Sequence, residues 1–330
     1  MIRHWLAMVG VSAAVLITTA DLGETASSRQ PGVQREVAVT FDDLPVATRA
    51  FQDDDAQARI TEKLLAAIRQ HDVPAIGFVN EVKLSPRGAV DDGRVALLRR
   101  WLAAGLELGN HTRSHLDLHI APLSAYLEDI GRGDSVTAAL LRSNGARPRY
   151  FRHPFLHTGR DLATRREVER FLAARAYRVA PVTIDNGDYI FAAAYERALV
   201  GGDESGQRRI ATSYLYYMER VFDYYERQSV AILGREMRQV LLLHANALNA
   251  DHFGALADMI TRRGYRFVSL DRALADSAYN SADRYTGAGG ISWLHRWALT
   301  EGKRGAFFAG EPTVPEAIER EAALPVQPRR

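Results

Sequence analysis

Two histidines lie four residues apart, at His111 and His115, within the segment HTRSH. Residues at positions i and i+4 share one face of a helix, so on a helix both imidazoles could bind one metal ion. Chance pairs on protein surfaces have the same spacing, so the pair alone indicates little. The sequence contains no cysteine, and a transition-metal site in this chain would therefore use only His, Asp and Glu.

A pair of adjacent carboxylates, Asp42 and Asp43, follows an apolar run that begins after Glu36. Neighbouring carboxylates repel each other unless a cation or a proton lies between them. One interpretation is an ordinary turn with a helix cap. The other gives Asp43 to a metal ion, together with the two histidines, and leaves Asp42 for proton transfer. Two nitrogen ligands and one oxygen ligand leave coordination positions open, which is typical of catalytic rather than structural zinc.

Two further polar residues, Arg152 and His244, come directly after apolar runs. An arginine in such a place can hold a carboxylate through two hydrogen bonds and fix its orientation. A single histidine is usually structural, but His244 ends the run VLLL. A histidine that ends a buried strand beside a metal site is a candidate general acid.

The elements that would position these residues alternate between short β-like runs and longer helical patterns. We predict strands at 36–40, 75–79, 106–109, 150–151, 177–180, 182–184, 240–244 and 265–269. We predict helices at 56–71, 90–104, 123–142, 160–175, 209–233 and 252–263. This alternation predicts an α/β fold with a parallel sheet, and over this length a barrel. In such barrels the chemistry lies at the carboxyl ends of the strands, where these polar residues fall.

Five short motifs occur in order along the chain: TFDD at 40–43, HTRSH at 111–115, RHP at 152–154, DNGDY at 185–189 and LLLH at 241–244. In this order they resemble the motifs T-F-D-D, H-[ST]-x-x-H, R-x-P, D-x-x-D-W and L-x-L-H of the polysaccharide deacetylase family. That family is also called the NodB-homology domain or carbohydrate esterase family 4. The resemblance covers about residues 35–275 and implies a deformed (β/α) barrel of the NodB-homology type.

The resemblance also implies a cofactor. It gives a divalent metal ion to Asp43, His111 and His115. Zn²⁺ is the expected metal, with Co²⁺, Mn²⁺ and Ni²⁺ as alternatives.

The acid–base groups implied by the resemblance are Asp42 as general base and His244 as general acid. Arg152 is expected to orient Asp42. One carboxylate of the fourth motif, Asp185 or Asp188, is expected to tune or orient His244, and we expect it to be Asp185.

Substrate contacts are expected at Pro154, Phe155, Asp188 and Tyr189. Three departures from the family pattern bear on the substrate more than on the chemistry. Tyr189 stands where the family usually has tryptophan, and Leu44, followed by Pro45, stands where it usually has glycine. A tyrosine-rich stretch at 212–227 lengthens the distance between the fourth and fifth motifs.

The function implied is metal-dependent removal of N-acetyl groups from an exported amino-sugar glycan, such as peptidoglycan, a chitin oligomer or poly-N-acetylglucosamine. One alternative is an O-acetyl esterase acting on xylan or an exopolysaccharide. Another is a non-catalytic glycan-binding module. The partner is in each case an acetylated carbohydrate. Nucleic acid is not expected as a partner, because 42 basic residues nearly balance 40 acidic ones.

The two ends of the chain differ from its middle. Residues 1–20 combine a basic start with a short apolar run, which predicts a signal peptide cleaved after Ala20, or alternatively an uncleaved anchor. We expect an exported protein, periplasmic or secreted, with no stable membrane span after cleavage. Residues 21–34 are expected to be a linker, 35–275 the catalytic barrel, and 276–330 a C-terminal extension whose tail, from Gly310, is mobile. Trp293 and Trp297 in that extension either pack on the barrel or stack on sugar rings.

Overall fold

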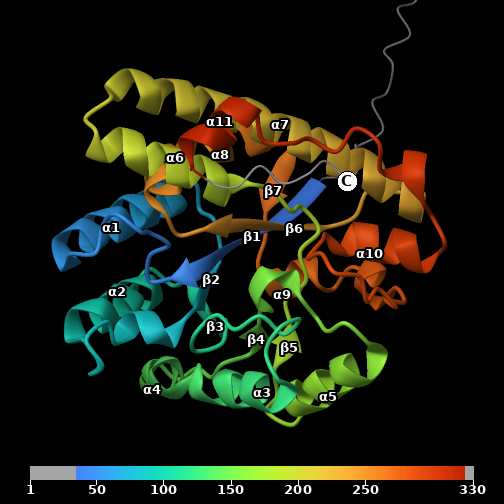
Figure 1. The fold of residues 1–330 in the computed structure, drawn as a ribbon, viewed down its shortest axis with the longest axis horizontal. Coiled ribbons are helices and arrows are strands. Elements are labelled where there is room, and N and C mark those ends of the chain that lie inside the picture. The colour runs from blue at the N-terminus through green and yellow to red at the C-terminus, as the bar shows by residue number, and fades with distance from the viewer. Residues whose placement is uncertain (1–34, 324–330) are drawn as a thin grey trace, which may run out of the picture. The chain divides into compact units, whose positions relative to one another are not determined.

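The first strand, β1 (Arg35–Leu44), lies in the middle of a parallel sheet (Figure 1). The computed structural model describes residues 35–323, so the predicted signal peptide (1–20) and linker (21–34) lie outside the described residues. Most residues of β1 are buried, as is usual for a central parallel strand. β1 is therefore the strand around which the rest of the sheet is built.

The other strands are β2 (Ile76–Val79), β3 (Glu107–Asn110), β4 (Tyr150–Phe151), β5 (Arg178–Val179), β6 (Gln239–His244) and β7 (Tyr265–Phe267). Their order is β5-β4-β3-β2-β1-β6, β7 pairs with the start of β1, and every pairing is parallel. After β5 the chain continues to Ile184, whose backbone bridges to Leu241 of β6. This segment connects the two edges of the sheet, which curls into a deformed barrel. The predicted α/β barrel class is confirmed.

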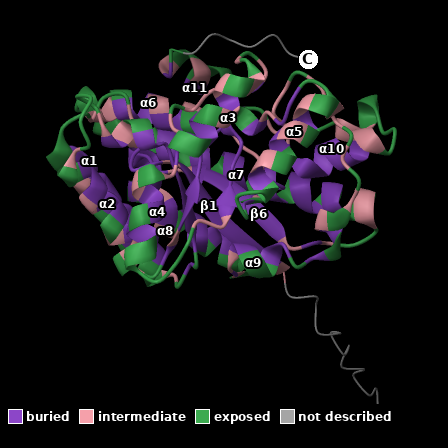
Figure 2. Cartoon of the chain, turned by 90° about the horizontal axis from the view of Figure 1, so that it is seen from below, coloured by how far each residue is buried: buried purple, intermediate pink, exposed green. Residues whose placement is uncertain are grey.

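Helices join the strands and surround the sheet (Figure 1). They are α1 (Asp54–Gln70), α2 (Asp92–Ala103), α3 (Leu123–Arg132), α4 (Ser135–Ser143), α5 (Leu162–Ala173), α6 (Asp188–Val200), α7 (Glu204–Leu233), α8 (Ala247–Arg262), α9 (Leu270–Ala273), α10 (Trp293–Thr300) and α11 (Glu316–Glu321). Short 3-10 turns are η1 (Glu81–Leu84), η2 (Pro154–Leu156), η3 (Ser277–Asn280) and η4 (Gly305–Phe308). Buried residues gather on β1, on β6 and on the inward sides of the helices (Figure 2). Within the described part of the chain, no helix has the length and apolar character to cross a membrane.

The helix predicted at 123–142 is in fact two helices, α3 and α4, which are separated at Gly133 and Asp134. Gly133 lies against the backbone of the histidine loop. A Cβ at this position would lie 2.6 Å from the carbonyl carbon of Thr112, so glycine allows an approach that other residues would block. The break therefore brings the helix pair close to the loop that carries the two histidines.

The C-terminal extension packs on the barrel. Trp293 and Trp297 are both buried, so the packing interpretation of these two residues is confirmed. Residues 310–323 differ from the expected mobile tail, because Val314 and Ile318 are buried and α11 contacts α6.

Candidate active site

The carboxyl ends of four strands meet at one edge of the barrel. Asp42 of β1 pairs in register with His244 of β6. Asn110, the last residue of β3, pairs in register with Phe151, the last residue of β4. Because the sheet is parallel, the residues that follow β3 and β4 reach the same edge as those that end β1 and β6.

Asp43, His111 and His115 form one group in which each residue offers a ligand atom, and these atoms lie within 4.8 Å of one another. Oδ1 of Asp43 is 3.6 Å from Nε2 of His115 and 3.9 Å from Nε2 of His111. This oxygen is buried and has no hydrogen-bond partner among the described residues. A buried carboxylate oxygen without a partner is costly, and a bound cation would satisfy it. The group therefore fits a divalent metal ion.

The two histidines lie on a loop after β3, and not on the helix that their spacing suggested. Thr112 and His115 both have left-handed backbone angles, with φ of 61° and 58°, which an α-helix does not contain. Oδ1 of Asn110 accepts a hydrogen bond from the N–H of Thr112 at 2.7 Å, and Oγ1 of Thr112 accepts one from the N–H of His115 at 3.0 Å. These side chains hold the loop so that both imidazoles face Asp43.

Both imidazoles are neutral at neutral pH. Burial lowers the pKa of His111 to about 4, and burial together with the neighbouring His111 lowers the pKa of His115 to about 4. Nδ1 of His111 donates to the carbonyl oxygen of Arg152 at 2.8 Å, which leaves the lone pair of Nε2 available. Burial raises the pKa of Asp43, but Lys83 and the histidines outweigh burial and keep this pKa below its usual range. Two neutral nitrogens and one carboxylate oxygen are a donor set that suits zinc.

Arg152 lies fully buried beside Asp42. Its Nη1 is 3.4 Å from both carboxylate oxygens of Asp42. Its Nη2 donates to Oγ1 of Thr40 at 3.0 Å, and its Nε donates to the carbonyl oxygen of Ala180 at 2.8 Å. Burial raises the pKa of Asp42, and the charge of Arg152 opposes that rise. Acceptors on β1 and on the segment after β5 thus fix the guanidinium next to the carboxylate.

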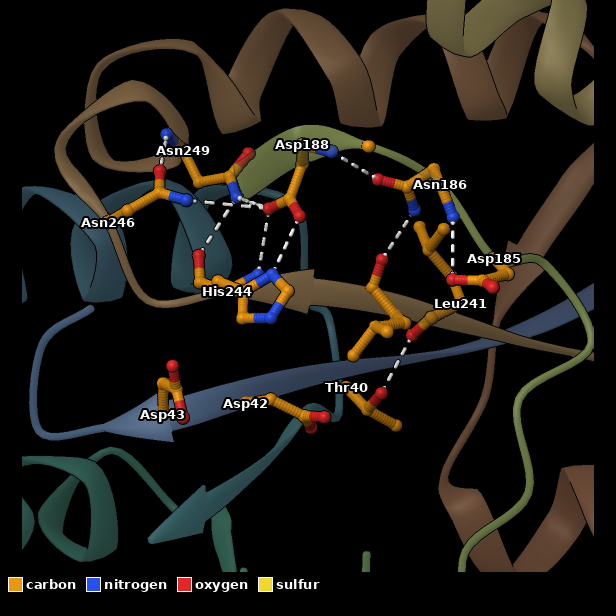
Figure 3. A network of polar contacts seen from close by, with 12 residues as sticks. Thr40, Asp42, Asp43, Asp185, Asn186, Asp188, Leu241, His244, Asn246 and Asn249 are labelled. Carbon is orange, nitrogen blue, oxygen red and sulfur yellow. Dashed lines mark hydrogen bonds and ion pairs between the residues drawn. The ribbon is translucent and has the colours of Figure 1, made fainter. Parts of the chain in front are cut away.

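His244 pairs with Asp188, whose side chain points at the imidazole in Figure 3. Nδ1 of His244 donates to Oδ1 of Asp188 at 2.7 Å, and the backbone N–H of His244 donates to Oδ2 at 2.9 Å. Burial lowers the pKa of His244, but Asp188 outweighs burial and raises this pKa to about 9. His244 is therefore protonated at neutral pH. No hydrogen bond from residues 35–323 occupies its Nε2.

The prediction that Asp185 orients His244 is wrong, because the imidazole is bonded to Asp188. Asn186 determines the path of this loop, because its Nδ2 donates to the carbonyl oxygen of Leu242 at 2.7 Å and its Oδ1 accepts from the N–H of Asp188 at 2.9 Å. Asp188 is thereby turned toward His244, while Asp185 accepts a hydrogen bond from the N–H of Asn186 at 2.9 Å. Burial raises the pKa of Asp185 to about 7. The motif spacing alone does not show which of the two carboxylates faces the histidine.

Three side chains that were not selected from the sequence support the site. Nδ2 of Asn249 donates to Oδ2 of Asp188 at 2.8 Å and to the carbonyl oxygen of His244 at 2.9 Å. Oδ1 of Asn249 accepts a hydrogen bond from the hydroxyl of Tyr214 at 2.8 Å. Nζ of Lys83 donates to the backbone carbonyl of Asp43 at 2.8 Å. The scarcity of lysine could have drawn attention to Lys83, but no sequence pattern links Tyr214 on α7 with Asn249 on α8.

Two half-exposed aromatic rings flank the site. Phe155 is 52% exposed and its ring centroid is 4.5 Å from that of His115, while Tyr189 is 49% exposed and 5.9 Å from His244. Pro154 is buried and begins η2, in which Phe155 has a φ of 55°. Within residues 35–323, the N–H of Phe155 has no backbone acceptor. Phe155 and Tyr189 thus lie at the rim of the site, whereas Asp188, also expected to contact substrate, is fully buried against His244.

A second group of possible ligands, Asp117, His119 and His157, satisfies itself without an ion. Nδ1 of His157 pairs with Oδ1 of Asp117 at 2.6 Å, and both ring nitrogens of His119 have backbone partners, Ala288 and Gly159. The two imidazoles stack with an interplanar angle of 7° and centroids 3.8 Å apart. The in-plane lone pairs of parallel rings do not converge on one ion, so this group does not resemble a metal site.

The site combines an Asp-His-His group with a buried carboxylate on one side and a protonated histidine on the other. These are the parts of a hydrolase that uses a metal-activated water. The sequence model of the family described as polysaccharide deacetylase matches residues 29–171. This span contains the first three motifs, and over it the match confirms the resemblance. Residues 29–171 of the chain are therefore similar to the polysaccharide deacetylase family.

Solved structures of similar chain path come from carbohydrate esterase family 4. A family 4 carbohydrate esterase from Streptomyces lividans is 21% identical, with 72% of this chain and 95% of that chain covered and a TM-score of 0.44. The peptidoglycan deacetylase PdaC from Bacillus subtilis is 18% identical, with 73% and 90% covered and a TM-score of 0.44. A mutant of a Bacillus anthracis pseudoenzyme with restored enzymatic activity is 14% identical, with 73% and 68% covered and a TM-score of 0.46. None of these likenesses bears on the substrate of this chain.

Proposed function

We propose that the protein hydrolyses N-acetyl groups on an exported amino-sugar glycan of the peptidoglycan, chitin-oligomer or poly-N-acetylglucosamine type. One observation carries the proposal: the buried Oδ1 of Asp43 has no partner among residues 35–323 and faces two neutral imidazoles. A candidate base and a candidate acid, Asp42 and His244, lie in register beside this group. The arrangement supports hydrolysis by a water molecule.

Asp43, His111 and His115 would hold a divalent cation, with Zn²⁺ as the expected metal. When bound, such an ion lowers the pKa of a water molecule and polarises a carbonyl group. The neutral imidazoles support this assignment, since a protonated histidine cannot be a ligand. The remaining residues of the site divide the proton transfers between them.

Asp42 accepts the proton of the attacking water. Burial raises the pKa of Asp42, which makes its carboxylate a stronger base than an exposed aspartate. Arg152 holds the carboxylate from the other side and keeps it directed at the site. The N–H of Phe155, which has no backbone acceptor among residues 35–323, is a donor for the negative charge that develops on the acetyl oxygen.

His244 donates a proton from Nε2 to the sugar nitrogen as the C–N bond breaks, so that acetate and a free amine leave. Its Nδ1 donates a hydrogen bond to Asp188, so Nε2 is the nitrogen that transfers the proton. An amide nitrogen leaves poorly unless it is protonated, whereas an alcohol of an ester leaves more readily. The His244–Asp188 pair therefore favours N-deacetylation over the O-acetyl esterase alternative.

The setting of the enzyme is part of the proposal. Residues 35–275 are proposed as the catalytic barrel, and the protein is proposed to work in the periplasm or as a secreted enzyme. The basic start and apolar run of residues 1–20 support export.

The test measures metal content and acetate release on a panel of N-acetylated and O-acetylated glycans. Asp42→Asn is expected to keep the metal and to lower kcat by about 10²–10⁴-fold, the range of a general base. His111→Ala is expected to lose both metal and activity, while Asp55→Asn, at an exposed site on α1, serves as the control. Acetate release from O-acetylated glycans alone would support the esterase. Folded, metal-bound protein that binds glycan but releases no acetate would be a binding module.

A further inference from the structure

The turn that carries Phe155 has a strained backbone. Phe155 and Leu156 both have left-handed φ values, 55° and 56°, which residues with a side chain disfavour. The turn has few backbone hydrogen bonds of its own: Leu156 N–H donates to His153 at 3.1 Å, and His157 N–H donates to Pro154 at 3.0 Å. The Phe155 ring is half exposed, so its burial does not hold the turn. A strained turn persists only where the surrounding structure holds it.

Gly290 of the C-terminal extension lies directly against this turn. A Cβ at position 290 would lie 1.7 Å from the carbonyl oxygen of Phe155, 2.8 Å from its carbonyl carbon and 3.2 Å from Cβ of Leu156. The oxygen is backbone and cannot swing away as a side chain would. The extension therefore contacts the peptide group of Phe155 itself, and only glycine permits that contact.

Arg296 ties the end of the turn to the extension. It is almost completely buried, and its Nη2 donates to Oγ1 of Thr158 at 2.6 Å while its Nε donates to Oδ2 of Asp283 at 2.8 Å. Arg165 of α5 donates to the same hydroxyl at 2.9 Å and to the carbonyl oxygen of Asp283 at 2.7 Å. Nη2 of Arg165 is also 3.3 Å from Oδ2 of Asp283, so the two guanidinium groups share one carboxylate and one hydroxyl. Their planar, fixed geometry leaves little freedom to Thr158.

The extension is itself fastened to the segment that closes the barrel. The N–H of Trp293 donates to the carbonyl oxygen of Val182 at 2.7 Å, and Oγ of Ser292 donates to that of Thr183 at 2.7 Å. The Arg296 guanidinium carbon lies 4.5 Å from the ring centroid of Trp293. Residues 283–296 therefore connect the barrel wall with the Phe155 turn.

We propose that residues 283–296 position the Phe155 turn, with Gly290 and Arg296 as positioning residues for the hydrolysis. This inference rests on the proposed function, because it concerns how well the N–H and the ring of Phe155 are aligned. The ring lies against His115, with centroids 4.5 Å apart. A displaced turn would therefore move a wall and a hydrogen-bond donor of the site while it leaves the three ligand atoms in place.

The experiment uses Gly290→Ala in the full-length protein, with Gly254→Ala on α8 as the matched control. The added methyl group at 254 meets only Nε2 of His71 within 4 Å, at 3.5 Å. Metal content, kcat and KM on an N-acetylated oligosaccharide, and the ¹⁹F resonance of 4-fluorophenylalanine placed at position 155 are measured for each protein. Gly290→Ala is expected to shift the ¹⁹F resonance, to keep the metal and to lower kcat about 10- to 100-fold, as small misplacements do. The control is expected to match the unsubstituted protein.

Arg296→Lys provides the second variant, and it decides the outcome if Gly290→Ala does not fold. It keeps the charge but loses the planar fork, and it is expected to shift the resonance and lower kcat in the same direction. The inference is overturned if folded variants keep the resonance unchanged. It is also overturned if the resonance shifts and kcat does not change. The ¹⁹F measurement needs no substrate. If the unsubstituted protein releases no acetate, the proposed function is overturned. The ¹⁹F measurement would still show whether residues 283–296 position the Phe155 turn.

Discussion

Replacing Asp188 with asparagine should remove the proton from His244 without removing the histidine. Asp188 is fully buried, and its two oxygens accept N–H groups from the imidazole, from the backbone of His244 and from Asn249. Asparagine has the same shape but only one acceptor oxygen. The amide NH2 group of asparagine would face either the imidazole Nδ1–H or the two donors that contact Oδ2. In the first orientation His244 relieves the clash by losing its Nδ1 proton, and in both orientations it loses the negative charge that favours its protonated form.

The size of the effect follows from the pKa of His244. Its rise from 6.5 to about 9 corresponds to about 3 kcal/mol, since one pKa unit is about 1.4 kcal/mol. Because Asp188 provides the largest contributions that raise it, Asp188→Asn should lower the pKa by about 2 units or more. In the metal-free protein this pair stabilises the fold fully below pH 6.5, and the stabilisation is lost as pH rises from 6.5 through about 9.

The direct assay is an NMR pH titration of the His244 ring in metal-free protein, followed by pH profiles of kcat in metal-loaded protein. Asp188→Asn should shift the alkaline limb of the kcat profile down by about 2 pH units, so that kcat falls about twofold at pH 7 and about tenfold at pH 8. Asp185→Asn is the matched control, because Asp185 makes no hydrogen bond to His244. If Asp185→Asn lowers the pKa of His244 while Asp188→Asn leaves it near 9, the assignment of the pair is wrong.

Three further outcomes are expected. Tyr214→Phe leaves Oδ1 of Asn249 buried without its donor, which should cost about 1–3 kcal/mol in urea unfolding and lower kcat more than it changes KM. Trp297→Ala, in the core of the extension, should cost about 3–5 kcal/mol by the same measurement, and a loss below 1 kcal/mol would contradict its packing role. Hydrogen bonding from Arg272 lowers the pKa of Glu36 from 4.5 to about 2, so its stabilisation is present above pH 4.5 and is lost as pH falls toward 2. Glu36→Gln should remove that part of the acid sensitivity in urea midpoints measured from pH 5 to pH 2.

The sequence predicted the strands and the residues at their ends well, because both depend on local patterns. Apolar runs ending in Asp42, Arg152 and His244 became strand ends at the same edge of the barrel, as a parallel sheet requires. The prediction of a helix at His111 was wrong. Side-chain hydrogen bonds and left-handed angles at Thr112 produce a loop, which nevertheless brings the two imidazoles together as a helix would.

The parts that could not be predicted depend on contacts between distant segments. Asp188 rather than Asp185 faces His244 because Asn186 reaches across to β6. Asn249 is oriented by a tyrosine of α7. Gly290 lies against Phe155 only after the extension has crossed the barrel. Neither periodicity nor motif spacing contains such information.

The pairing of β1 with β6 has a consequence for how the chain must fold. Val37 pairs with Gln239, so β2 to β5 and α1 to α7 are all synthesised before this side of the central strand can be covered. Contacts between residues so far apart in the sequence form slowly. Until then β1 presents an open edge with Val39 and Phe41 on an apolar strand, which can pair with another chain. The incomplete chain, rather than the folded enzyme, is therefore the form most exposed to aggregation.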